Sequence, residues 1–163
     1  MDKLFYYDTQ IGKLGIRADH IGITNIYFRE INIKEEKVVL EESDLIKDAY
    51  IQLEEYMNGQ RTQFDLPLNL KGTEFQKKVW SELAKIPYGE TRSYKDIAIA
   101  IGNEKASRAV GMANNKNPIP IVIPCHRVVG ANKKLIGYAG GLDIKEKLLN
   151  LEGISVKNNK IYK

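Results

Sequence analysis

The chain has 163 residues, of which 43% are apolar and 28% are charged, a composition typical of a folded globular protein. It contains no apolar run of the roughly 20 residues that a membrane-spanning helix needs, so we expect no membrane partner. One cysteine cannot form an internal disulfide, and with only two histidines it cannot assemble a Cys/His zinc site. The first residues also lack the apolar core of a secretory signal, so we expect a reducing, cytoplasmic setting.

Charge is divided unequally along the chain. Residues 1–70 carry 8 Lys or Arg against 13 Asp or Glu, whereas residues 71–163 carry 17 against 8. The second part can therefore meet a polyanion such as nucleic acid, while the first part would be repelled by one. Because basic surfaces are also common on proteins that bind no nucleic acid, this asymmetry indicates a partner only in combination with other signals.

The N-terminal part is predicted to contain strands followed by one helix. Short β-rich runs, separated by turn signals, span residues 4–9, 13–18 and 23–28. Residues 43–58 predict a helix with Ser43 as its N-cap and Gly59 as its stop. The apolar positions of that helix are Ile46, Ala49, Tyr50, Leu53 and Met57.

Residues 60–72 have little periodicity and are predicted to be a linker, and the charge balance changes sign there. We therefore place a domain boundary at this point. The expected organisation is an N-terminal α/β domain over residues 1–70, with a structural role, and a second domain over residues 71–163.

Four helices are predicted in the second domain, over residues 73–86, 93–101, 105–113 and 142–151. The first begins with a capping-box pattern formed by Thr73 and Gln76, and the last ends at Gly153. The two middle helices are short, with Gly102 between them, which is typical of a helix-turn-helix. Many helical hairpins share this pattern and bind nothing, but Arg108 and the basic charge of this domain favour nucleic-acid binding.

The stretch IPIVIPCHRVVG, residues 119–130, carries the only cysteine of the chain. Its β-branched residues Ile119, Ile121, Val122 and Ile123 predict a buried strand that ends at Cys125, although the prolines at 118, 120 and 124 limit its pairing. A lone cysteine is more often a small buried hydrophobe than a nucleophile. Here, however, His126 and Arg127 make the local field positive, which favours the thiolate. Lowering a thiol pKa from about 8.5 by two units requires roughly 2.7 kcal/mol, which one histidinium or a donor network can supply.

Consecutive side chains of an extended segment point to opposite faces, so Cys125 and His126 should not touch directly if the strand continues through them. A bridging water, or a turn at Pro124, would be needed to bring the imidazole to the sulfur. The residues alone leave both arrangements open.

The octamer IPCHRVVG closely resembles the active-site signature of the O6-alkylguanine-DNA alkyltransferases, also called methylated-DNA–protein-cysteine methyltransferases. The resemblance extends through FQKKVWSELAKIPYGETRSYKDIA, KASRAVGMANNKNPIPIVIPCHRVV and GYAGGLDIKEKLLNLEG, nearly all of residues 73–153. Residues 1–70 match more loosely, through IGKLGIRADHIGITNIYF. The resemblance implies an α+β fold, with a small ribonuclease H-like N-terminal domain and a mostly helical C-terminal domain that contains the helix-turn-helix.

The resemblance also implies roles for individual residues. Cys125 would accept an alkyl group from O6 of guanine in one irreversible step, without a cofactor. His126 would act on it through a water, and Glu152 would hold and polarise that histidine. Asn117 would support the turn around the thiolate, and Tyr94 would donate toward the guanine ring as charge builds on the departing base. Further contacts to the guanine pocket are implied for Val128, Tyr138, Ala139 and Lys145.

The implied partner is double-stranded DNA containing O6-alkylguanine, bound by a monomer. A base inside a duplex cannot reach a buried sulfur, so the nucleotide must be flipped out, here through the minor groove. Arg108 resembles the arginine finger that fills the gap in the stack. Lys95 and Asn103 match positions near the DNA backbone, and such phosphate contacts make binding sensitive to salt.

Comparison within the family sharpens these expectations. Ala139 stands where some members have serine, so only a backbone donor remains there for O6. The ligands of the N-terminal zinc site of human-type members are absent, and Cys125 stands where the non-transferring alkyltransferase-like proteins have tryptophan. Two alternatives to transfer remain: a module that only recognises damaged DNA, and a cysteine hydrolase built from Cys125, His126 and Glu152. A hydrolase would turn over repeatedly, whereas an alkyltransferase is consumed by one reaction.

Overall fold

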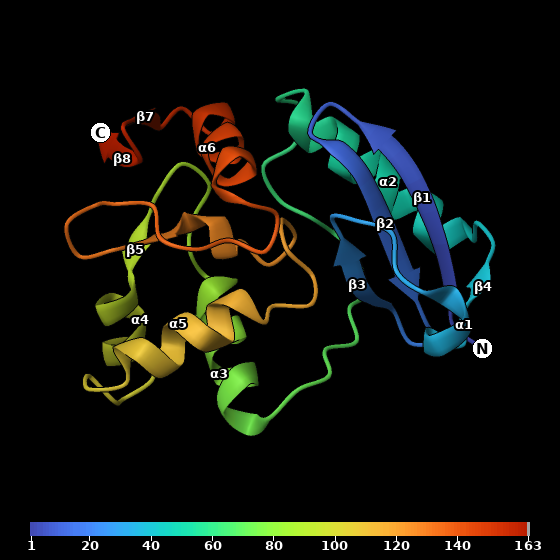
Figure 1. The fold of residues 1–163 in the computed structure, drawn as a ribbon, viewed down its shortest axis with the longest axis horizontal. Coiled ribbons are helices and arrows are strands. Elements are labelled where there is room, and N and C mark those ends of the chain that lie inside the picture. The colour runs from blue at the N-terminus through green and yellow to red at the C-terminus, as the bar shows by residue number, and fades with distance from the viewer. Residues whose placement is uncertain (163) are drawn as a thin grey trace. The chain divides into compact units, whose positions relative to one another are not determined.

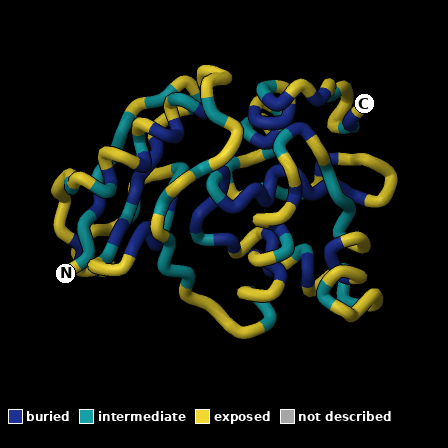
Figure 2. The backbone as a smooth tube through the Cα atoms, turned by 180° about the vertical axis from the view of Figure 1, so that it is seen from behind, coloured by how far each residue is buried: buried dark blue, intermediate teal, exposed yellow. Residues whose placement is uncertain are grey.

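The computed structural model describes residues 1–162, and the chain divides into two compact units between Lys71 and Gly72 (Figure 1). The first unit combines a sheet with helices, and the second is mostly helical, which confirms the expected α+β class. Figure 2 shows that the buried backbone lies in the interior of each unit, while turns and outer helix faces are exposed. Within the described residues, no helix is both long enough and apolar enough to cross a bilayer.

The N-terminal unit is built on a four-stranded sheet. Its elements are β1 (Lys3–Thr9), β2 (Gly12–Ala18), β3 (Ile23–Tyr27), α1 (Ile33–Glu36), β4 (Val39–Leu40) and α2 (Asp44–Met57). The strand order is β3-β2-β1-β4, with β1, β2 and β3 antiparallel in a meander and β4 parallel to β1. Gly12 permits the tight β1–β2 turn because its φ of 110° is open to glycine and strained for other residues.

Helix α2 packs on one face of this sheet, and Ser43 caps its N-terminus as predicted. One predicted core position differs. Tyr50 is only half-buried, and its ring stacks on that of Tyr7 in β1 at 3.9 Å between centroids. Tyr56, which the apolar pattern did not include, is fully buried instead. The ring of Tyr50 thus contributes to the packing of α2 on β1 while its edge stays in solvent.

The predicted linker, residues 60–72, is largely an extended strap on the N-terminal unit. The amide of Ile23 donates to the carbonyl of Pro67 at 2.8 Å, and the amide of Asn69 donates back to the carbonyl of Ile23 at 2.8 Å. Buried Gln52 of α2 exchanges two hydrogen bonds with the backbone of Asp65. The strap has no apolar periodicity because backbone and amide groups, rather than an apolar face, attach it.

The C-terminal unit contains α3 (Glu74–Leu83), β5 (Arg92–Ser93), α4 (Tyr94–Ala100), α5 (Ser107–Asn115), the 3-10 helix η1 (Cys125–Arg127), β6 (Val128–Val129), α6 (Leu142–Leu151), β7 (Ser155–Lys157) and β8 (Lys160–Tyr162). Capping boxes at Thr73 and Ser93 begin α3 and α4. Buried Trp80 of α3 ties this helix to α5, because its Nε1 donates to the carbonyl of Ala113 at 2.8 Å. The helices α4 and α5 form the expected helical hairpin around Gly102.

The predicted strand over residues 119–123 is wrong, although the segment is buried as expected. It is a tight turn, in which the amide of Ile123 donates to the carbonyl of Ile119 at 2.9 Å and Ile121 has a positive φ of 75°. Prolines at positions 118, 120 and 124 have no amide hydrogen, so this segment cannot complete a strand ladder. β-branched residues here fill the core rather than extend a sheet.

Candidate active site

Cys125 begins a single turn of 3-10 helix directly after Pro124, so the chain turns where an extended strand would have separated the sulfur from the imidazole. The side chain of Asn117 fixes this turn. Its Nδ2 donates to the carbonyl of Ile123 at 2.8 Å, and its Oδ1 accepts from the amide of Ile119 at 3.0 Å. Cys125 is only 3% exposed. The turn therefore presents the sulfur to the interior of the C-terminal unit.

The Cys125 thiol is held protonated in the free protein. Burial raises its pKa to about 11, and hydrogen bonds from Asn117 and Tyr138 and the charge of Lys145 only partly oppose this rise. The sequence-based expectation of a lowered pKa is therefore wrong for this state. The positive field expected from Arg127 does not prevail because its guanidinium pairs with a carboxylate, as described below.

His126 and Glu152 form a buried pair. Nε2 of His126 lies 2.7 Å from Oε2 of Glu152, and both side chains have no exposed area. Although burial raises the pKa of a carboxyl group, the hydrogen bonds from His126, Arg127 and Gly89 outweigh it and lower the pKa of Glu152 to about 2. Burial lowers the pKa of His126. An ionised carboxylate only accepts, so neutral His126 carries its proton on Nε2 and keeps a lone pair on Nδ1.

Arg127 completes the environment of Glu152. Its Nε and Nη2 donate to the two carboxylate oxygens at 2.9 and 3.0 Å, and its Nη1 donates to the carbonyl of Ile86 at 2.7 Å. Its guanidinium carbon also lies 5.7 Å from the ring centroid of Tyr88. The amide of Gly89 adds a further donor to Glu152 at 2.9 Å. A carboxylate that accepts a bidentate arginine, an imidazole and an amide is fixed in position and charge.

Lys145 is the second buried cation near the thiol. It lies on α6 with no exposed area, and its ammonium donates to the carbonyls of Val128, Ile136 and Gly137 at 2.7, 3.2 and 3.3 Å. Burial lowers its pKa to about 8, and Cys125 has only a smaller, opposing effect. Lys145 thus ties the loop after β6 to the backbone next to the 3-10 helix.

The hydroxyl of Tyr94, at the start of α4, donates to the carbonyl of Ile136 at 2.9 Å. Burial, with a smaller effect from Cys125, raises the pKa of Tyr94 to about 12, so the phenol stays protonated near neutral pH. Tyr94 and Lys145 therefore bind the same carbonyl. Together they hold the loop over residues 130–141 against the site.

The remaining predicted pocket residues lie on or next to that loop. The amide of Val128 donates to the carbonyl of Cys125, so in this state it is not available to a ligand. Tyr138 is half-buried with its hydroxyl inside, where it contributes a hydrogen bond to Cys125. Ala139 is exposed.

Three predicted residues lie outside the buried cluster, on the exposed surface of the helical hairpin: Lys95, Asn103 and Arg108. Arg108 is on α5, one turn before Gly111. A Cβ at Gly111 would lie 3.7 Å from the ring of Tyr94, at ordinary van der Waals contact, so this position of α5 faces Tyr94. The structure thus assembles the residues around Cys125 and leaves the arginine of α5 in solvent.

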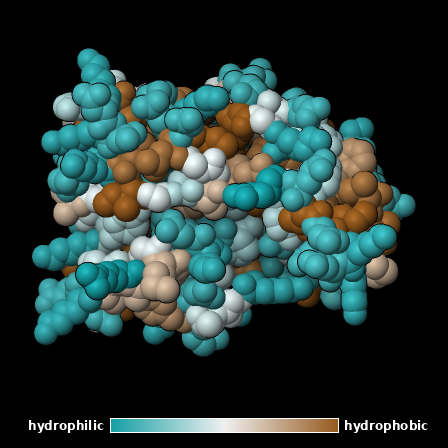
Figure 3. Space-filling model, in the orientation of Figure 1, coloured by the Kyte–Doolittle hydropathy of each residue, from teal (hydrophilic) through white to brown (hydrophobic). Residues whose placement is uncertain are grey.

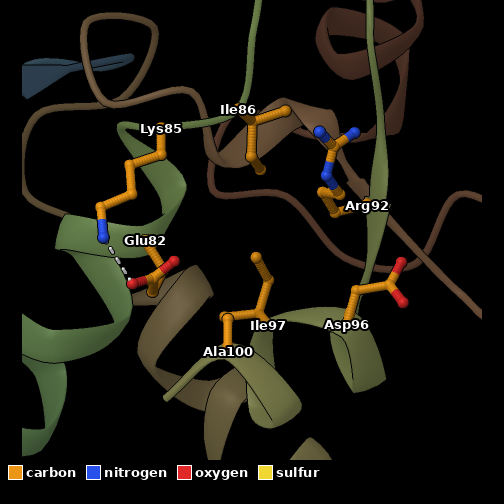
Figure 4. Close-up of a pocket in the computed structure, with 7 residues that line it drawn as sticks. All are labelled: Glu82, Lys85, Ile86, Arg92, Asp96, Ile97 and Ala100. Carbon is orange, nitrogen blue, oxygen red and sulfur yellow. Dashed lines mark hydrogen bonds and ion pairs between the residues drawn. The ribbon is translucent and has the colours of Figure 1, made fainter.

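A surface hollow of about 390 Å³ lies between α3 and α4, and Figure 4 shows seven residues that line it. Its charged side chains are already engaged. Lys85 pairs with Glu82 at 2.8 Å, and Asp96 accepts the amide of Ser93 in the capping box. None of the predicted site residues is among the residues that line it, so it is separate from the thiol site.

Sequence reasoning missed two residues of the site. Arg127 was expected only to supply charge, and Asn114 of α5, whose Nδ2 lies 3.4 Å from the carbonyl of Cys125, was not considered. Both are polar residues within segments that are otherwise buried and apolar. A polar residue in such a segment indicates a buried hydrogen-bond partner, and this could have identified them. Among the described residues, no group of three His, Cys, Asp or Glu side chains could hold a metal ion.

The buried carboxylate generates a prediction on stability. Glu152→Gln leaves Arg127 buried without its charge partner, so we expect the free energy of unfolding at pH 7 to fall by about 3–5 kcal/mol. The pKa of Glu152 is lowered from 4.5 to about 2, so the wild-type advantage is complete above pH 4.5 and is lost as pH falls toward 2. Urea unfolding of both proteins across this range measures the difference.

The matched control for that variant is Glu82→Gln. It removes an exposed ion pair with Lys85, which is expected to contribute at most about 1 kcal/mol. Equal losses for the two variants, or a Glu152→Gln loss that is unchanged between pH 5 and pH 2, would contradict the assignment of Glu152 as a stabilising buried anion.

Comparison with known proteins identifies the family of the chain. Residues 4–70 match the family model of the 6-O-methylguanine DNA methyltransferase ribonuclease-like domain, and residues 74–154 match that of its DNA binding domain. Methylated-DNA–protein-cysteine methyltransferase of Methanosarcina acetivorans is 51% identical over 90% of this chain and 96% of its own. The constitutive protein of that name from Bacillus subtilis is 47% identical over 92% and 94%.

Solved structures give the same result. The O6-methylguanine methyltransferase of Mycobacterium tuberculosis superposes with a TM-score of 0.86 at 43% identity, covering 93% of each chain. A structure of OGT of the same organism in complex with DNA has a TM-score of 0.85 at 42% identity, again over 93% of each chain. On the evidence of both domains and of near full-length similarity, the chain belongs to the O6-alkylguanine-DNA alkyltransferase family.

Proposed function

We propose that this protein repairs DNA by transferring an alkyl group from O6 of guanine to Sγ of its own Cys125. The observation that carries the proposal is the buried thiol of Cys125 on the same 3-10 turn as His126, whose imidazole bonds the Glu152 carboxylate that Arg127 fixes. In the reaction the S–C bond forms as the C–O6 bond breaks. The thiol proton passes through a water to Nδ1 of His126, and guanine leaves as an anion that must be protonated. The products are a thioether and intact guanine.

Substrate entry has to activate the thiol, because the free protein keeps it neutral. With a pKa of about 11, forming the thiolate at pH 7 costs on the order of 5 kcal/mol. A neutral His126 can accept that proton, since its lone pair lies on Nδ1. We infer that deprotonation accompanies binding of the base. Until then the thiol stays neutral, and a neutral thiol is less prone to oxidation.

Tyr94 supplies the proton donor for the departing base. Its phenol is protonated near neutral pH and now donates to the carbonyl of Ile136. When an alkylguanine enters, the hydroxyl exchanges that carbonyl for the ring of the base. Lys145 keeps the same carbonyl bonded during the exchange, because its ammonium already donates to it. The backbone near Ala139 and the ring of Tyr138 complete the pocket in this proposal.

The buried position of Cys125 means that a base within a duplex cannot reach it, so we propose that the nucleotide is flipped out through the minor groove. Arg108, exposed on α5, fills the space left in the stack, while Lys95 and Asn103 contact the backbone. The C-terminal unit binds DNA and carries out the transfer, and the N-terminal unit is structural. The protein acts as a cytoplasmic monomer without a cofactor, and each chain reacts once because the thioether is not reversed.

The first test follows the methyl group. Incubation with duplex DNA that contains O6-methylguanine is expected to add one methyl group to the peptide containing Cys125, as measured by peptide mass spectrometry. Repair should stop at one guanine per chain, because the thioether is not reversed. Cys125→Ser and undamaged duplex are the controls. Continued repair beyond one equivalent would indicate a hydrolase, and binding without mass gain would indicate a recognition module.

The second test separates flipping from chemistry. Arg108→Ala is expected to slow repair of duplex DNA about 10- to 100-fold, equivalent to roughly 1.4–2.7 kcal/mol of flipping energy. Reaction with the free base O6-benzylguanine should change less than about twofold, because no duplex has to be opened. Arg61→Ala, which removes an arginine paired with Glu55 in the acidic unit, is the control. Equal losses of reaction rate on both substrates would contradict the proposal that Arg108 fills the gap in the base stack.

A further inference from the structure

Three lysines lie side by side on three adjacent segments of the C-terminal unit. In the antiparallel hairpin of β7 and β8, Lys157 is opposite Lys160. On its other side Lys160 is opposite Lys134, which lies in the loop after β6. Directly opposite residues place their side chains on the same face, about 5 Å apart. With the neighbouring Lys133, they form what we call the C-terminal lysine cluster.

Among residues 1–162, no carboxylate forms an ion pair with this cluster. Lys133, Lys134 and Lys157 are exposed and Lys160 is half-exposed, and within the described residues none of the four takes part in an ion pair. Like charges directly opposite on neighbouring strands lower stability. The cluster therefore carries a repulsion that a bound anion would relieve.

The backbone that presents the cluster is anchored. The amide of Leu135 donates to the carbonyl of Asn159 at 2.8 Å, and that of Ile161 donates to the carbonyl of Lys133 at 2.9 Å. Side chains alternate along the hairpin, so Val156 and Ile161 face inward. Ile161 packs in a core cluster with Val129, Leu135, Leu149 and Ile154. The lysines thus extend from a fixed surface. Figure 3 shows that hydrophilic side chains cover much of the face of the molecule in view.

The cluster lies beside the thiol site. Two residues after Lys134, the carbonyl of Ile136 accepts from both Tyr94 and Lys145. Three residues after it, Gly137 approaches Asn115 of α5, where a Cβ would lie 3.2 Å from the side-chain amide. A chain extends at most about 3.6 Å per residue, so the Cα of Lys134 is within about 7 Å of that of Ile136. The loop that carries Lys134 therefore reaches both the thiol site and α5.

We propose that the C-terminal lysine cluster binds phosphates of the DNA strand that flanks the flipped guanine. The proposal rests on the function proposed above but uses a segment, residues 155–162, that lies beyond the match to the DNA binding domain at residue 154. The row of three ammonium groups spans about 10 Å. Phosphates follow one another every 3.4 Å or so of helix axis on each strand, so the row faces two or three of them.

Salt dependence of DNA binding tests this assignment. The variant Lys134→Gln/Lys157→Gln/Lys160→Gln keeps polar side chains of similar size and removes three charges. Its plot of log affinity against log salt, measured with duplex containing O6-methylguanine, should be shallower than wild type by about two to three, since each phosphate contact contributes roughly 0.9. The control variant also removes three positive charges from the C-terminal unit, at Lys77 and Lys78 of α3 and at Lys85 just after it. It should leave the slope within about 0.5 of wild type. No change, or an equal change in both variants, would overturn the proposal.

Thermal unfolding provides an independent readout of the same cluster. At low salt without DNA, the triple variant should have a higher melting temperature than wild type, because the repulsion between lysines is removed. The difference should disappear at high salt. A lower melting temperature at low salt would overturn the premise that the lysines repel one another. Transfer from O6-benzylguanine should be the same in wild type and variant. If the wild-type protein did not accept the benzyl group from O6-benzylguanine, the proposed chemistry at Cys125 would be rejected instead.

Discussion

The structure depends on one buried anion, the carboxylate of Glu152. It accepts hydrogen bonds from His126, Arg127 and Gly89, and these come from the 3-10 helix and from the turn after α3. Glu152 itself ends α6, so one side chain connects three separate segments. A buried charge without these donors would be strongly destabilising. The same contacts that hold the C-terminal unit together therefore also fix the orientation of the His126 imidazole.

Because the reacting groups are buried, their protonation states before a ligand binds differ from those that the reaction needs. The field of the folded protein keeps Cys125 as a thiol and His126 as a neutral base, so neither group is charged before a ligand arrives. Lys145 and Tyr94 both bind the carbonyl of Ile136 and close the loop against this site. An entering base must displace contacts of that loop. In the function proposed above, selection of a flipped-out base and protection of the thiol would both follow from the burial of Cys125.

Local signals in the sequence predicted much of this fold, because they act within a few residues. Capping residues at Ser43 and Thr73 located two helix starts, and apolar periodicity located α6. The strand expected before Cys125 failed because β-branched residues also fill buried turns, and prolines decided the outcome. The resemblance named most of the residues around the thiol. The bidentate pair of Arg127 with Glu152 joins residues that are distant in the sequence, so no local pattern could predict it.

The central claim is that Glu152 holds His126 as a neutral base with its proton on Nε2. Nitrogen NMR of the imidazole rings tests it directly, and the only other histidine, His20, is exposed in a turn and serves as the reference signal. The account predicts that the His126 ring shows the shifts of a neutral imidazole protonated at Nε2 at pH 7, and stays neutral below pH 6.5. An imidazolium at pH 7, or a neutral ring protonated at Nδ1, would contradict it.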